Sequence, residues 1–230
     1  MEAANLIIDI GNTALKAAWA DGMTLGKTFR YQGERMLDFI LSLTEKTKPN
    51  VMILSSVRTF SKQAVEKLRN ECTRLIIIDE NILERYDVPS YLSPDRAASI
   101  IASRYLFKKR GCTIFDLGTT LTVDFLDPEG RYEGGNVSLG CRTRFKALNR
   151  YAKPLPLLGA AEDISQKGTD IASSITSGVI SGMMFEIDGY VSQHPENIAV
   201  FTGGDAIYFA KRMKNSIFVV CNLVLMGLAL

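Results

Sequence analysis

Short apolar runs and stretches of helical spacing alternate along the chain, in an order of elements that occurs twice. In the first half, apolar runs broken by turn residues predict strands over residues 5–9, 15–20, 24–30, 51–54 and 75–78. Apolar positions at helical spacing predict helices over residues 33–46, 61–71 and about 94–108, with a loop over 80–93. Three consecutive strands followed by alternating helices and strands indicate an α/β fold.

The second half repeats this order. Apolar runs predict strands near residues 112–116, 120–126, 130–137, 199–202 and 217–221. Helical spacing predicts helices near residues 140–151 and 170–192, with shorter ones on either side of the last strand. We therefore expect two similar α/β domains, over residues 1–110 and 111–230, with the boundary near Gly111.

The first apolar run ends in Asp9, a small polar turn that contains Gly11, Asn12 and Thr13 follows, and a second apolar run resumes at Leu15. Gly11 can adopt positive φ or let a phosphate approach the backbone, and the turn's N–H groups can face an anion together with Asn12 and Thr13. Asp9 at the strand end could hold a metal ion that bridges phosphates. When the stretch is taken alone, an ordinary hairpin turn is the better explanation, because Asp, Asn, Gly and Thr are common in turns for conformational reasons.

The same stretch occurs again at residues 114–121, where Asp116, Gly118 and Thr120 repeat the spacing of the first copy. Two such hairpins across a cleft would hold one polyphosphate from both sides. This arrangement resembles the actin/Hsp70/sugar-kinase superfamily, whose two phosphate loops have this form. The resemblance implies two ribonuclease-H-like domains with a nucleotide in the cleft between them.

Composition excludes several classes of protein. Apolar content of 47%, charged content of 23% and a net charge of +2 are those of an ordinary globular protein, without a basic patch for nucleic acid. No signal peptide is apparent, and the apolar residues 216–230 are too short to cross a bilayer, so we expect a cytoplasmic protein without membrane contact. His194 is the only histidine, and the four cysteines lack metal spacing, so a general base is expected to be a carboxylate.

The predicted loop ends at Ser93, and Pro94, Asp95 and Arg96 begin the predicted helix. Helix capping explains the first three, because Ser suits an N-cap, Pro the first helical position and Asp the positive end of the helix dipole. It does not explain Arg96. A carboxylate can accept a hydroxyl proton during phosphoryl transfer, and a neighbouring guanidinium can hold a substrate carboxylate.

Gly203 and Gly204 follow a predicted strand and precede a predicted helix. Nucleotides commonly bind at such carboxyl ends of strands in α/β sheets, although a simple strand-to-helix turn has the same composition. We expect both glycines to contact the nucleotide.

Taken together, the motifs resemble the type III pantothenate kinases. The order is Asp-x-Gly-Asn-Thr, Ser-Ser-Val after a strand, a Tyr-x-x-Pro-x-x-Leu-x-x-Asp-Arg loop, Asp-x-Gly-Thr with a later Thr-x-Asp, a Gly-Gly hairpin and a late Gly-Gly-Asp. The resemblance covers residues 5 to about 206. It implies ATP-dependent phosphorylation of the terminal hydroxyl of pantothenate, the first step toward coenzyme A. The alternatives are a kinase for another small hydroxy acid and a non-catalytic accessory regulator of the same fold.

The resemblance also implies roles for individual residues. The first phosphate loop would comprise Asp9, Ile10, Gly11, Asn12, Thr13, Ala14, Leu15 and Lys16, with a further ATP contact at Thr119. Asp95 would be the catalytic base, and pantothenate would contact Tyr86, Ser93, Pro94, Asp95, Arg96 and Thr169. Mg²⁺ would bind at Asp9 and a monovalent cation, K⁺ or NH₄⁺, at Asp116. A homodimer would form through the helix near residues 170–192.

The chain departs from the family pattern in the substrate region. Ser93 stands where the family usually has Gly, and Val88 where it usually has Asn. Counting back from Gly178 places Ile171 at the position of a substrate-binding Thr. Thr169 is the candidate to take over that contact.

Overall fold

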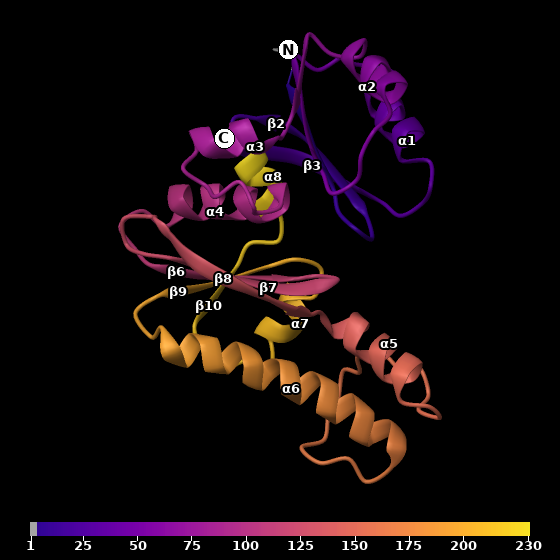
Figure 1. The fold of residues 1–230 in the computed structure, drawn as a ribbon, viewed down its shortest axis with the longest axis vertical. Helices are drawn as coiled ribbons and strands as arrows, with labels where there is room; N and C mark the ends of the chain where they lie inside the picture. The colour runs from indigo at the N-terminus through magenta and orange to yellow at the C-terminus, as the bar shows by residue number, and fades with distance from the viewer. Residues whose placement is uncertain (1–3) are drawn as a thin grey trace. The chain divides into compact units, whose positions relative to one another are not determined.

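The computed structural model describes residues 4–230, which divide into two compact units (Figure 1). Unit 1 runs to Leu106 and takes up the chain again over Asn222–Leu230, while unit 2 comprises Phe107–Cys221. This division differs from the ranges expected from sequence mainly at the C-terminal end, where the last helix packs within unit 1 rather than unit 2.

The sheet of unit 1 has the strand order β3-β2-β1-β4-β5. Its strands are β1 (Asn5–Ile10), β2 (Leu15–Asp21), β3 (Thr24–Tyr31), β4 (Val51–Ser56) and β5 (Arg74–Ile77). β1 pairs antiparallel with β2 and parallel with β4. The helices are α1 (Met36–Thr44), α2 (Lys62–Arg69), α3 (Glu80–Arg85), α4 (Pro94–Leu106) and α8 (Leu223–Leu228).

Both faces of β1 are covered, which explains its continuous apolar run. Leu6 and Ile8 lie in a core cluster with residues of α1 and α2, such as Ile40 and Leu68. Ile7, which points to the opposite face, packs with residues of α4 and α8. Figure 1 shows α4 and α8 beside one another, apart from α1 and α2. The polar residues of this strand are therefore confined to its ends.

The sheet of unit 2 has the order β10-β9-β6-β7-β8. Its strands are β6 (Cys112–Leu117), β7 (Thr120–Leu126), β8 (Tyr132–Leu139), β9 (Ile198–Thr202) and β10 (Ile217–Val219). Its helices are α5 (Cys141–Tyr151), α6 (Ile171–Gln193) and α7 (Ala206–Ala210). The three helices share one core with the sheet, in which Phe145, Ile180 and Phe209 pack against Phe115 and Phe201.

The two sheets have one plan. In each, the first strand is central, pairs antiparallel with a hairpin strand on one side and pairs parallel with a later strand on the other. The prediction of two similar α/β domains is thereby confirmed.

One predicted segment was wrong. Residues 80–93, expected to be loop, include the short helix α3, whose N-cap Asp79 accepts a hydrogen bond from the Ile82 amide at 3.0 Å. A helix of this length is too short to show a clear apolar period.

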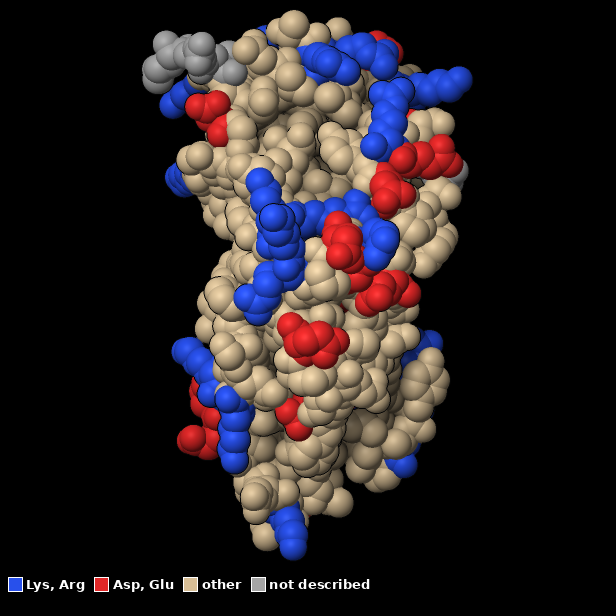
Figure 2. Space-filling view, turned by 90° about the vertical axis from the view of Figure 1, so that its left-hand side faces the viewer, with Lys and Arg blue, Asp and Glu red and all other residues tan. Residues whose placement is uncertain are grey.

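None of the described helices is long and apolar enough to cross a membrane. Lys and Arg side chains lie interspersed with Asp and Glu on the face that Figure 2 draws. This mixture agrees with the net charge of +2.

Gly227 on α8 marks the closest approach between two helices of unit 1. A methyl group added there would overlap the carbonyl of Ala98 on α4. Both residues are buried, so neither helix can move aside without opening the core.

We expect Gly227→Ala to lower the midpoint of thermal unfolding, with a cost of about 2 kcal/mol or more from overpacking. Gly189→Ala on α6 is the matched control, because nothing lies within 4 Å of the added methyl group. It should stabilise slightly, by about 0.5–1 kcal/mol, because Ala favours a helix more than Gly does. Circular dichroism during heating compares the two, and equal midpoints for Gly227→Ala and the parent chain would contradict this account.

Candidate active site

The predicted first phosphate loop leaves the carboxyl end of β1. Asp9 is only 7% exposed and accepts a hydrogen bond from the Ser55 hydroxyl at 3.0 Å. The Gly11 amide donates to the carbonyl of Ala14 at 3.1 Å and closes the turn. The loop therefore presents a short stretch of polar backbone and side chains next to an anchored, buried carboxylate.

The segment after β4 braces this loop. The Val57 amide donates to the carbonyl of Ile10 at 3.0 Å. The guanidinium of Arg58 donates to the carbonyl of Asn12, also at 3.0 Å. Arg58 brings a positive charge to the loop that sequence reasoning did not single out. Its position directly after Ser-Ser-Val was the available signal.

Residues 86–93 form a loop that the rest of unit 1 holds in place. The guanidinium of Arg104 donates to the carbonyls of Tyr86 at 2.6 Å and Asp87 at 2.9 Å. Val88 and Leu92 are each 3% exposed, so their side chains anchor the loop in the core. The apolar residue at position 88, where the family usually has Asn, is thus part of the packing.

The candidate catalytic pair lies at the start of α4. The Ala97 amide donates to the carbonyl of Ser93 at 3.1 Å, which closes the first turn. The Arg96 amide donates to the carboxylate of Asp95 at 3.0 Å. Ser93, Pro94, Asp95 and Arg96 are all partly exposed. The helix start thus orients a carboxylate and a guanidinium on consecutive residues.

The predicted second phosphate loop leaves the carboxyl end of β6 in unit 2. The Gly118 amide donates to the carbonyl of Thr120 at 3.0 Å, as Gly11 does to Ala14 in the first loop. The carbonyl of Thr119 accepts from the Gly140 amide at 3.1 Å and from the Thr143 hydroxyl at 2.6 Å. The start of α5 therefore fixes this turn.

Gly203 packs directly onto the second loop. Its φ is +91°, and a methyl group there would overlap the Asp116 carboxylate and lie 2.6 Å from the carbonyl oxygen of Leu117. The Asp205 amide also donates to that carbonyl, at 3.0 Å. Only glycine allows the β9–α7 turn to approach so closely. The Asp116 carboxylate and the Leu117 carbonyl both lie against Gly203, and oxygen donors of this kind fit a monovalent cation. Gly204 faces open space.

Thr169 precedes α6 and belongs to unit 2, whereas Tyr86 and Arg96 belong to unit 1. The Thr169 amide donates to the Ser173 hydroxyl at 3.0 Å, and Asp170 caps the helix through the Ser173 amide at 2.9 Å. Ile171, at the position of the expected Thr, is 61% exposed. The capping of α6 thus fixes the backbone on which both residues lie.

Cys112 and Cys141 are poor metal ligands in this structure. Burial raises the pKa of the Cys112 and Cys141 thiols to about 11, so both carry their proton at neutral pH. Among residues 4–230, no group of three or more His, Cys, Asp or Glu side chains is arranged to hold a metal ion. In nucleotide sites Mg²⁺ is bound by one or two carboxylates together with phosphate oxygens and water. A single carboxylate such as that of Asp9 fits this mode of binding.

A family model described as type III pantothenate kinase matches residues 5–193. The chain belongs to the type III pantothenate kinase family. The sequence resemblance is therefore confirmed. A type III pantothenate kinase of Azobacteroides pseudotrichonymphae is 34% identical over 230 residues, which cover 97% of this chain and 94% of that relative.

Solved structures with low sequence identity to this member of the type III pantothenate kinase family share its fold. A conserved Baf-family protein of Campylobacter jejuni, described as a transcriptional activator, has a TM-score of 0.66 at 19% identity and covers 96% of this chain and 94% of its own. The activator of 2-hydroxyisocaproyl-CoA dehydratase from Clostridium difficile, with bound ADPNP, has a TM-score of 0.56 at 14% identity. This match covers 98% of this chain and 92% of that chain. The predicted actin-like α/β fold is confirmed.

We expect Asp9→Asn and Asp116→Asn to weaken ATP binding about ten- to hundredfold without unfolding the chain. Asn has nearly the volume of Asp, and at position 9 its amide oxygen can still accept from Ser55. Calorimetric titration with ATP, Mg²⁺ and K⁺ measures the effect, and circular dichroism checks the fold. Asp21→Asn, at the exposed end of β2, is the control. Loss of secondary structure in either loop variant would make that carboxylate structural instead.

Proposed function

We propose that this chain transfers the terminal phosphoryl group of ATP to the terminal hydroxyl of pantothenate, the first step of coenzyme A biosynthesis. The observation that carries the proposal is the Asp95–Arg96 pair at the start of α4, in a chain that belongs to the type III pantothenate kinases. The reaction needs ATP, so we place the enzyme in the cytoplasm.

ATP binding is assigned to both phosphate loops. In unit 1 the hairpin over residues 9–16 offers backbone N–H groups and the Asn12 and Thr13 side chains to the phosphates. Arg58 adds a positive charge beside this turn. In unit 2 the ATP contacts are Thr119, Gly203 and Gly204, and the open space beside Gly204 leaves room for a ligand.

Two metal ions belong to the proposal. Asp9 would hold Mg²⁺, and when bound this ion neutralises charge on the phosphate oxygens. Asp116 would hold K⁺ or NH₄⁺, because its carboxylate and the Leu117 carbonyl both lie against Gly203 and offer oxygen donors. A monovalent cation supplies positive charge in a loop whose residues 116–121 contain no Lys or Arg.

The acceptor is assigned to the loop that ends in α4. The carboxylate of Asp95 orients the terminal hydroxyl and accepts its proton as the oxygen bonds to phosphorus. Arg96 holds the carboxylate of pantothenate through two parallel hydrogen bonds. The remaining contacts are Tyr86, Ser93, Pro94 and Thr169. The anchoring of residues 86–93 by Arg104, Val88 and Leu92 fixes the backbone of Tyr86 and Ser93 before substrate binds.

We further propose a homodimer in which α6 supplies the contact surface. Ile171 and Phe185 on this helix are 61% and 75% exposed. Gly178 and Gly182 lie between them on the same face, with nothing within 4 Å of an added methyl group. Exposed apolar side chains that flank glycines form a surface against which a second helix can pack closely.

An ATP-consumption assay with pantothenate and other hydroxy acids tests the reaction. Pantothenate should give the highest kcat/KM, because Arg96 and the loop select for its carboxylate and hydroxyl together. Turnover should be much higher in KCl than in NaCl at equal ionic strength, because the Asp116 site selects by ion size. A different preferred hydroxy acid would redirect the proposal to that substrate, and equal rates in the two salts would remove the cation site.

Asp95→Asn and Arg96→Ala should have separable effects. Asp95→Asn should lower kcat by about 10²–10⁴-fold, toward the low end if the transition state is loose. Arg96→Ala should mainly raise the KM for pantothenate, by about ten- to hundredfold, because a charge-assisted contact is lost. The KM for ATP should change little in both.

Asp38→Asn on α1 is the control for loss of a carboxylate outside the site. Near-normal kcat in correctly folded Asp95→Asn would leave Asp95 only the helix-terminal role that its contact with the Arg96 amide also suits. No turnover of any hydroxy acid by the parent chain would favour a binding protein over an enzyme.

A further inference from the structure

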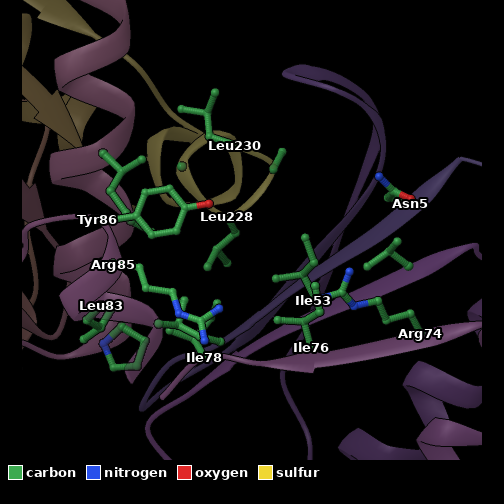
Figure 3. Close-up of a pocket in the computed structure, with 17 residues that line it drawn as sticks. Asn5, Ile53, Arg74, Ile76, Ile78, Leu83, Arg85, Tyr86, Leu228 and Leu230 are labelled. Atoms are coloured by element: carbon green, nitrogen blue, oxygen red, sulfur yellow. The ribbon is translucent and has the colours of Figure 1, made fainter. Parts of the chain in front are cut away.

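Unit 1 contains a cavity of about 470 Å³ over β4 and β5, on the face of the sheet that α4 and α8 cover elsewhere (Figure 3). Its floor is apolar, because Ile53, Ile76 and Ile78 point to this face. These isoleucines are only partly buried, although Leu83 and Leu228 in the walls are almost fully buried. The helices thus leave part of an apolar sheet face open.

Two arginines give the cavity a positive charge. Arg74 lies at the start of β5, and Arg85 is the last residue of α3. Figure 3 shows their guanidinium groups extending from opposite sides toward the space above the isoleucines. Among the side chains that the structure describes, none that lines the cavity is acidic. The ion pairs described for residues 4–230 include neither arginine.

An apolar floor beside two guanidinium groups matches one class of ligand. Arg binds carboxylates through paired hydrogen bonds, while the isoleucines favour a hydrocarbon group. The volume lies in the range of small-molecule sites, which combine apolar walls with a few polar groups that fix orientation. A polar sugar would leave its hydroxyl groups unpaired against the isoleucines.

The cavity borders the proposed acceptor site through Tyr86 and Pro94 but contains none of its charged groups and none of the proposed phosphate contacts. Asn5, Val51 and Arg74, which line it, lie at the amino ends of their strands, whereas Asp9 and Ser55 lie at the carboxyl ends. Neither Asp95 nor Arg96 lines the cavity. The loop touches it only through Tyr86 and Pro94.

We propose that this cavity is a second binding site of the chain, for a carboxylate with a short hydrocarbon tail. The carboxylate pairs with Arg74 and Arg85, and the tail lies on Ile53, Ile76 and Ile78. The inference rests on these residues alone and does not depend on the proposed kinase reaction.

Isothermal titration of the full chain with octanoate tests this site. The dissociation constant should be about 1 mM or lower. Acetate, which lacks the tail, and 1-octanol, which lacks the charge, should each bind at least about tenfold more weakly. Octanoate should still bind when pantothenate is present at saturation, because its carboxylate pairs with Arg74 and Arg85, whereas that of pantothenate is assigned to Arg96.

Arg74→Gln and Arg85→Gln should each weaken octanoate binding about ten- to hundredfold. Both arginines are exposed, so the variants should fold, and circular dichroism verifies it. Arg69→Gln is the matched control, because Arg69 pairs with Glu66 on α2 and does not line the cavity. Equal affinity in all three variants, no binding by the parent chain, or displacement of octanoate by pantothenate would each overturn the proposal.

Discussion

The structure depends on the burial of two central strands on both of their faces. Leu6, Ile7, Ile8 and Ile10 of β1 are all 0% exposed. Such a strand can carry polar groups only near its ends, and any carboxylate there needs a partner. Asp9 meets this requirement through the Ser55 hydroxyl on the neighbouring parallel strand. The same constraint in unit 2 places Asp116 at the end of β6, where the β9–α7 turn closes over it.

Features set by local sequence could be predicted. The local features were the Asp-x-Gly-x-Thr hairpins, the repeated order of elements and the start of α4 at Pro94. Each of these features depends on residues that are close to one another in the chain. Apolar period and turn chemistry act at that range, so the fold class and the two hairpins followed from the sequence.

Features set by distant contacts could not be predicted. The placement of α8 in unit 1 depends on Gly227 fitting against Ala98, far away in the chain. The contact of Arg58 with the Asn12 carbonyl requires β1 and β4 to be neighbours. Val88 is apolar where the family usually has Asn, and only the structure explains this difference, because the side chain is buried. None of these pairings leaves a periodic trace in the sequence, because each is a single contact.

The return of the chain to unit 1 at Asn222 affects the order in which the protein can fold during synthesis. Unit 2 is one continuous stretch, Phe107–Cys221, so all of its strands exist before the ribosome has made α8. Unit 1 stays incomplete until α8 emerges, because α8 covers Ile7 and Ala18 on the face of the sheet that it shares with α4. Nascent unit 1 therefore exposes apolar surface throughout the synthesis of unit 2, which is the period when a chaperone would have most to bind.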